Sequence, residues 1–151
     1  MKNRPLRISL ESFLRAKIMR NESCKVTEFQ SGKVGGYHKL IIWQKGREFI
    51  RLIYRKTENF PKSEIFGLQS QIRRAAISFS LNIVEGQRRD SKKEFLRFLG
   101  IADASLTEVE ACLEIAFDLG FLEKVDYEEI ENKRMELAIM IRAFIKGIKR
   151  L

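Results

Sequence analysis

Apolar residues recur every three or four positions along most of the chain, and short polar breaks divide this pattern into four long segments. Such a period places the apolar side chains on one face of an α-helix. The pattern predicts four helices of about 20–28 residues, over residues 38–57, 63–85, 92–119 and 127–150. Only two prolines occur, at Pro5 and Pro61, as is typical of a chain built from uninterrupted helices.

The segment 92–119 has the most regular pattern. Its stripe alternates spacings of four and three residues: Phe95, Leu99, Ala102, Leu106, Val109, Leu113 and Ala116. This period predicts helices that pack side by side at a shallow angle. Further apolar residues widen the face, namely Phe98, Ile101, Cys112 and Ile115. A face of this width can contact two neighbouring helices or a second subunit.

Residues suited to begin a helix precede three of the segments. Ser63 is expected to be the N-cap of the second helix. Ser91 followed by Glu94 forms a capping-box pattern for the third helix, and Asp126 followed by Glu129 imitates one for the fourth. We therefore expect the helices to start close to these residues.

Three glycines carry structural expectations. Gly46 lies inside the first predicted helix, where it costs about 1 kcal/mol of helix propensity, so we expect a neighbouring helix to approach closely there. Gly86 and Gly120 follow the second and third segments and suit the left-handed conformation that closes a helix. In the fourth segment, Arg134 occupies a position where the stripe lacks an apolar residue.

Four helices joined by short loops predict an all-α fold, an antiparallel up-down-up-down four-helix bundle over residues 37–151. A chain of 151 residues can bury its core without disulfides, so Cys24 and Cys112 are expected to be reduced in a cytoplasmic protein. The chain has no apolar run of the ~20 residues that cross a membrane, and we expect no membrane partner.

Residues 1–36 differ from the rest. They form a poorly defined basic N-terminal extension, with one short predicted helix over residues 9–20 and a linker that ends at Gly35 and Gly36. Three interpretations remain open. The extension contributes nothing specific, or it is an arm for an anionic partner or subunit, or Met19 is the true start.

The chain carries 29 basic and 20 acidic residues, a net charge of +9. Residues 1–36 account for 8 basic and 3 acidic side chains. An excess of positive charge favours polyanion partners, nucleic acid first. The candidate nucleic-acid-binding residues are Arg73, Arg74, Arg88, Arg89, Lys92, Lys93 and Arg97. Arg88, Arg89, Lys92 and Lys93 share one end of the predicted bundle, whereas Arg73 and Arg74 lie about 20 Å away along the second helix. The alternative is a solvated surface that keeps the protein soluble.

The second predicted helix ends with a polar pair on one face, Asn82 and Glu85, followed by Gly86. We interpret the pair as structural, with Asn82 fixing helix register and Glu85 neutralising Arg89 or a basic residue of the first predicted helix. The other interpretation is a site for a nucleotide or a cation. The carboxylates Glu110 and Glu114 are expected on a solvated helix face.

Catalytic chemistry has little support in the sequence. His38 is the single histidine, and it lies at the edge of a predicted helix. The chain has no HExxH, cysteine-rich metal pattern, P-loop or GxSxG motif. We therefore expect no catalytic residues, no metal and no cofactor, and hence a protein that is not an enzyme.

Several motifs of residues 43–99 occur in the order of a known family: Trp43-Gln-Lys45, Phe60-Pro-Lys62, Gly67-Leu-Gln-Ser-Gln-Ile-Arg-Arg-Ala75, Asn82-Ile-Val-Glu-Gly86, Arg89 and Glu94-Phe-Leu-Arg-Phe-Leu99. The chain thereby resembles the four-helix-bundle proteins encoded in intervening sequences of bacterial 23S rRNA genes, labelled the S23 ribosomal protein family. That family is related to the accessory variability determinant of diversity-generating retroelements. The resemblance is strong over about residues 37–122, loose over the last helix and absent from residues 1–36.

The resemblance implies a closed homo-oligomer, a pentamer, with a basic surface for RNA or DNA, and for the retroelement relatives a reverse transcriptase as partner. Three positions depart from the family: Ser80 replaces a usual proline, Val84 an alanine and Ala104 a glycine. We expect a non-enzymatic, RNA-associated nucleic-acid-binding or adaptor protein. The alternative is a protein–protein interaction module, for example a reverse-transcriptase accessory subunit, with no direct nucleic-acid role.

Overall fold

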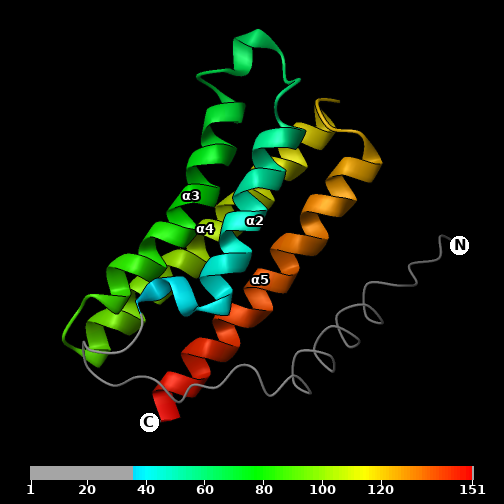
Figure 1. The fold of residues 1–151 in the computed structure, drawn as a ribbon. Coiled ribbons are helices and arrows are strands. Elements are labelled where there is room, and N and C mark those ends of the chain that lie inside the picture. Colours follow the sequence, from blue (N-terminus) through cyan, green and yellow to red (C-terminus); the bar gives the residue numbers. More distant parts are fainter. Residues whose placement is uncertain (1–35, 151) are drawn as a thin grey trace, which may run out of the picture.

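The computed structural model describes residues 36–150, which form four antiparallel helices (Figure 1). These are α2 (Ile41–Lys56), α3 (Leu68–Gln87), α4 (Lys92–Asp118) and α5 (Lys124–Arg150), with short 3-10 turns η1 (Tyr37–Lys39) and η2 (Lys62–Glu64). Each helix packs on the next along the chain, and α2 also packs on α5, which closes the bundle. The predicted all-α four-helix bundle is confirmed. The predicted helix over residues 9–20 and the linker to Gly35 lie outside the described residues.

The core is built from the apolar faces of the helices. All seven heptad residues of α4 are buried, from Phe95 to Ala116. They meet Ile72, Phe79 and Ile83 of α3, each with no exposed surface. Burying one large apolar side chain contributes about 1.5–3 kcal/mol, so this seam is a major source of stability.

The two ends of α4 are formed as the sequence predicts. The Ser91 hydroxyl oxygen accepts a hydrogen bond from the Glu94 backbone N–H at 3.1 Å. At the other end Gly120 has a φ of 73°, and the Phe121 N–H donates to the Ala116 carbonyl at 2.9 Å. A residue without a Cβ adopts this left-handed conformation most readily, which explains the glycine.

The predicted start of the second helix is wrong. Ser63 lies within η2, and α3 begins only at Leu68, because Gly67 adopts a non-helical conformation with φ −98° and ψ −127°. The cap comes from Glu64 instead, whose carboxylate oxygen accepts from the Leu68 N–H at 3.0 Å. The first helix also starts later than predicted, at Ile41, because η1 forms a separate turn before it.

The predicted cap of the fourth helix is wrong as well. Helix α5 begins at Lys124, so Asp126 lies inside its first turn. The Asp126 carboxylate accepts from the Lys56 ammonium at 2.5 Å, and Glu129 lies 2.7 Å from the same ammonium. These contacts, the hydrogen bond to Asp126 first, raise the pKa of Lys56. A contact between α2 and α5 has replaced a local cap.

Two glycines inside helices, Gly46 and Gly86, also allow close packing because they lack a side chain. A Cβ at Gly46 would lie 2.6 Å from Oγ of Ser80 and 3.1 Å from the ring of Phe79, which confirms the predicted close approach. Gly86 does not end α3 as predicted but lies buried inside it. A Cβ there would lie 2.8 Å from Cβ of Phe98, so this glycine allows α3 to pack closely on α4.

A buried ion cluster joins α4 and α5. Arg134 is 5% exposed, and Nε and Nη2 of its guanidinium lie 2.7 and 2.5 Å from the Glu131 carboxylate oxygens. Nη2 also lies 3.0 Å from Oε1 of Glu110, so Glu110 is not simply solvated as predicted. Burial alone would lower the pKa of Arg134, but the bonds and charges of the two carboxylates outweigh it and raise the pKa.

Within residues 36–150, no helix is long and apolar enough to cross a membrane. The same residues contain no group of three or more His, Cys, Asp or Glu side chains placed to hold a metal ion.

Candidate nucleic-acid interface

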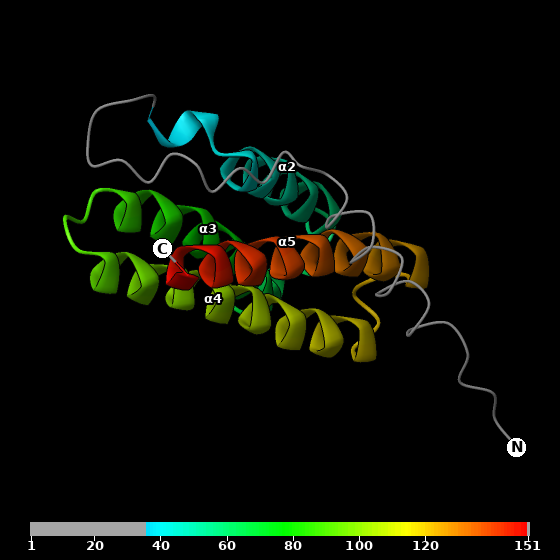
Figure 2. The same ribbon diagram turned by 90° about the horizontal axis from the view of Figure 1, so that it is seen from below.

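The antiparallel topology gathers basic residues at one end of the bundle. The turn between α3 and α4, the C-terminus of α5 and the start of α2 all lie at this end (Figures 1 and 2). We call it the basic end. Its cations are Arg88, Arg89, Lys92, Lys93 and Arg97 of the turn and of α4, and Lys146, Lys149 and Arg150 of α5.

The cations of the turn fall into two groups. Arg89 forms an ion pair with Glu85, as predicted, and Nε of Arg97 lies 3.3 Å from a carboxylate oxygen of Glu94. In the part of the chain that the structure describes, Arg88, Lys92 and Lys93 form no ion pair. These three side chains therefore leave positive charge available to a ligand.

The side chain of Phe98 links the two paired arginines. The guanidinium groups of Arg89 and Arg97 each lie 4.9 Å from the centre of its ring. Cation–π contacts of this kind contribute about 0.5–1 kcal/mol at an exposed site. They hold both arginines beside the turn, where their charge adds to that of the unpaired cations.

The structure separates Arg73 and Arg74 from the turn. Arg73 joins α3 to α2, because its Nε donates to Oγ1 of Thr57 at 2.9 Å and its Nη2 to the Tyr54 carbonyl at 3.3 Å. Its guanidinium also lies 4.5 Å from the centre of the Tyr54 ring. Arg74 is exposed on α3. Arg73 is thus largely engaged in packing, and the seven predicted residues do not form one patch within a subunit.

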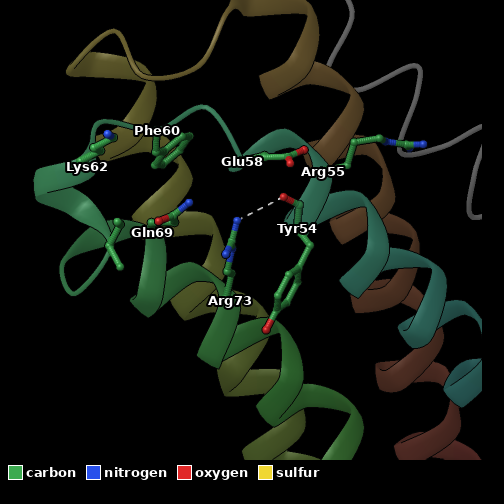
Figure 3. Close-up of a pocket in the computed structure, with 8 residues that line it drawn as sticks. Tyr54, Arg55, Glu58, Phe60, Lys62, Gln69 and Arg73 are labelled. Carbon is green, nitrogen blue, oxygen red and sulfur yellow. Dashed lines mark hydrogen bonds between the residues drawn. The ribbon is translucent and has the colours of Figure 1, made fainter.

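A pocket of about 630 Å³ lies beside Arg73, at the bundle end opposite the basic end (Figure 3). It is lined by Tyr54, Arg55, Glu58, Phe60, Lys62, Ile65, Gln69 and Arg73. The amide of Gln69 is buried and donates to the Thr57 carbonyl, which fixes one wall. The lining residues include no histidine, cysteine or serine.

The pair Asn82 and Glu85 has the geometry of the structural interpretation. The Asn82 amide donates to the carbonyl and the hydroxyl of Ser78 at 2.8 and 3.1 Å. The Ser78 hydroxyl in turn lies 2.9 Å from that of Ser105 on α4. This chain of hydrogen bonds crosses the seam between the two helices and favours one register. With Gly86 in the same seam, the motif serves helix packing.

Sequence reasoning missed two parts of the basic end. Lys146, Lys149 and Arg150 were not among the predicted site residues, although an antiparallel bundle must bring them to the α3–α4 turn. The aromatic residues at the start of α2 were not among the predicted site residues either, and His38 was expected only at the edge of a helix. The predicted topology was the signal that could have located the first group.

The fold and the basic end define a four-helix-bundle protein with a concentrated cationic surface. Residues 38–143 match the family model of the 23S rRNA-intervening sequence protein, so the chain belongs to that family. Its structure is similar to that of a protein of unknown function from the S23 ribosomal protein family of Bacteroides thetaiotaomicron VPI-5482. The two are 28% identical with a TM-score of 0.63, over 70% of this chain and 99% of the other. A comparison with curated proteins found no match.

Proposed function

We propose that this protein is a cytoplasmic, non-enzymatic homo-oligomer that binds nucleic acid through phosphate contacts at the basic end, with RNA as the expected class. The observation that carries the proposal is the set of three cations without an acidic partner in the described chain, Arg88, Lys92 and Lys93. Contacts to phosphates give affinity without sequence preference, which suits an RNA-associated adaptor.

The position of the lysines supports this proposal. Lys92 and Lys93 lie in the first turn of α4, where the helix dipole is positive. A cation there costs roughly 0.3–1 kcal/mol, whereas the basic residues at the C-terminus of α5 are favourable. Helix stability therefore does not explain the lysines, and a bound anion would offset their cost.

The first experiment measures binding of a structured RNA at several salt concentrations. Replacing Arg88, Lys92 and Lys93 together by glutamine should weaken binding about tenfold or more at low salt. The slope of log affinity against log salt should also fall by about 2 to 3, because three phosphate contacts are lost.

The matched control for this experiment removes the same charge elsewhere. Arg51, Arg55 and Lys62 are exposed, form no ion pair in the described chain and lie away from the basic end. Replacing these three residues by glutamine should keep most of the RNA affinity and most of its dependence on salt. An equal loss of RNA affinity in the two triple variants would contradict a site localised at the basic end.

Assembly through α4 is the second part of the proposal. Ile101, Ile115 and Leu119 are 37%, 50% and 58% exposed. Ile101 and Ile115 belong to α4 and Leu119 directly follows it; the three recur at helical spacing, so they lie on one side of the helix. Exposed apolar side chains aligned in this way favour contact with a second copy. Five subunits is the number that the family resemblance implies.

Glutamate at both Ile115 and Leu119 should dissociate the oligomer, because a contact between copies would then bury charge without a partner. Light scattering should show the mass falling from a multiple of 17.7 kDa toward 17.7 kDa itself. Ile41→Glu, at an exposed residue of α2, is the control that should keep the assembly. An unchanged mass in the double variant would show that α4 is not the contact.

A protein partner is the alternative function, and one feature favours it. Phe66 is 97% exposed and Ile65 is 48% exposed, both in the connection between η2 and α3. A partner such as a reverse transcriptase could cover them. A pull-down that recovers one stoichiometric protein after nuclease treatment, and loses it in Phe66→Ala, would favour this alternative over nucleic-acid binding.

A further inference from the structure

Three aromatic rings gather on the surface where the described chain begins. Tyr37 and His38 of η1 lie 4.0 Å apart between ring centres, and both contact Trp43 of α2 edge to face at 5.0 and 5.1 Å. The guanidinium of Arg47 lies 5.0 Å from the centre of the Trp43 ring. We call these four residues the aromatic platform.

The aromatic platform is not part of the hydrophobic core. His38 is exposed, and Tyr37 and Trp43 are only half-buried. Large aromatic side chains usually stabilise a protein by full burial, and these three lack that role. Hydrogen bonds hold them in place instead, because the Gln44 amide donates to the His38 carbonyl at 2.9 Å and so ties η1 to α2.

The aromatic platform lies at the basic end. The turn η1 contacts both α2 and α3, and both views place it at the end where the α3–α4 turn and the C-terminus of α5 lie (Figures 1 and 2). Phe98, with Arg89 and Arg97 over its ring, provides a second aromatic–arginine group at this end. Cations and accessible rings therefore occur together.

We infer that the basic end binds single-stranded nucleic acid, with unpaired bases stacked on the aromatic platform, an inference that rests on the proposed phosphate binding. Proteins that hold single strands combine a cationic surface with aromatic rings on which bases stack. A duplex keeps its bases inside its own stack and offers only its backbone and grooves. Bases on the rings and phosphates on Arg88, Lys92 and Lys93 would use both features of this surface.

Trp43 makes the inference directly measurable, because it is the single tryptophan of the chain. A base stacked on or beside it should quench its fluorescence. The probes are a 12-nucleotide single-stranded RNA, an abasic oligonucleotide of the same length and a duplex RNA of 12 base pairs, each titrated into the full-length protein at low salt. We expect the single strand to quench Trp43 and to bind about tenfold or more tightly than the abasic strand.

The outcomes separate this inference from the function on which it rests. Equal, salt-sensitive binding of all three probes without quenching would overturn base stacking and leave phosphate binding intact. No binding of any probe would overturn both. Tighter binding of the duplex than of the single strand would likewise overturn the inference.

A pair of variants tests the rings themselves. Tyr37→Ala combined with His38→Ala should reduce single-strand affinity about tenfold, leave abasic-strand affinity unchanged and retain Trp43 as the reporter. Tyr54→Ala, which removes an exposed ring at the opposite end, should change neither affinity. Because Tyr37 and His38 lie outside the core, circular dichroism should show a folded protein. Unchanged single-strand affinity in the double variant would refute the role of the aromatic platform.

Discussion

Replacing Arg134 by alanine should lower the free energy of unfolding by about 3–5 kcal/mol, the loss typical of breaking a buried ion pair. The guanidinium is bonded to Glu131 and Glu110, and the side chain of Glu131 is nearly as buried as that of Arg134. Removing the cation leaves the Glu131 charge in a poorly solvated place without a partner. Denaturant unfolding at one fixed protein concentration measures the difference.

Arg142→Ala is the matched control for Arg134→Ala. Arg142 belongs to the same helix and lies 3.2 Å from Asp103, but its side chain is 61% exposed. An exposed ion pair contributes at most about 1 kcal/mol, so this variant should be nearly as stable as the parent. A similarly small loss of unfolding free energy in Arg134→Ala and Arg142→Ala would show that the Arg134 cluster is better solvated than its burial indicates.

Replacing Gly86 by leucine should also destabilise the protein, by about 3 kcal/mol. A Cβ at this position already lies 2.8 Å from Cβ of Phe98 and 3.0 Å from Cδ2 of Phe95, so α3 and α4 would have to separate. Overpacking a tight contact typically costs about 1–3 kcal/mol, and the further carbons of leucine place this change at the upper end. Thermal and denaturant unfolding would both report it.

The control for Gly86→Leu is the same change at Gly100. That glycine lies inside α4, is exposed, and would have no atom within 4 Å of an added Cβ. Leucine is a better helix former than glycine, so Gly100→Leu should stabilise by up to about 1 kcal/mol. A loss of stability at Gly86 together with a gain at Gly100 would distinguish the effect of helix packing from that of helix propensity. A change in stability of the same sign at both positions would contradict the assigned role of Gly86.

Helix periodicity was the most informative feature of the sequence. The stripe from Phe95 to Ala116 is buried as predicted, because a side chain on the apolar face of a long amphipathic helix has few alternatives to the core. Ser91 and Gly120 also perform their predicted roles at the ends of α4. Predictions made from neighbouring residues were correct where the contacting residues are themselves close in the sequence.

Capping rules failed where a distant partner competed. Asp126 was expected to cap α5, but Lys56 of α2 binds it. Ser63 was expected to cap α3, but the helix begins after Gly67 and uses Glu64. Gly86 has the composition of a helix end, yet the approach of Phe98 from α4 explains it better. None of these contacts can be deduced from neighbours in the sequence.

In the candidate site, too, some features were visible in the sequence and others depended on contacts between distant parts of the chain. The cations around Arg88 were visible in the sequence because they lie within one short stretch, residues 88–97. The role of Arg73 was not, because its partners Thr57 and Tyr54 lie 16 and 19 residues away. The aromatic platform needed the turn η1 to bring Tyr37 and His38 onto Trp43.

By itself, the sequence determined the all-α class, four helices, the buried stripe of α4 and the excess of positive charge, because each follows from periodicity or composition. The tertiary structure decided which charges are free and which are paired, where glycine is required and which surfaces meet at the basic end. Those properties depend on distances between segments far apart in the chain. Such distances are fixed only when the helices pack.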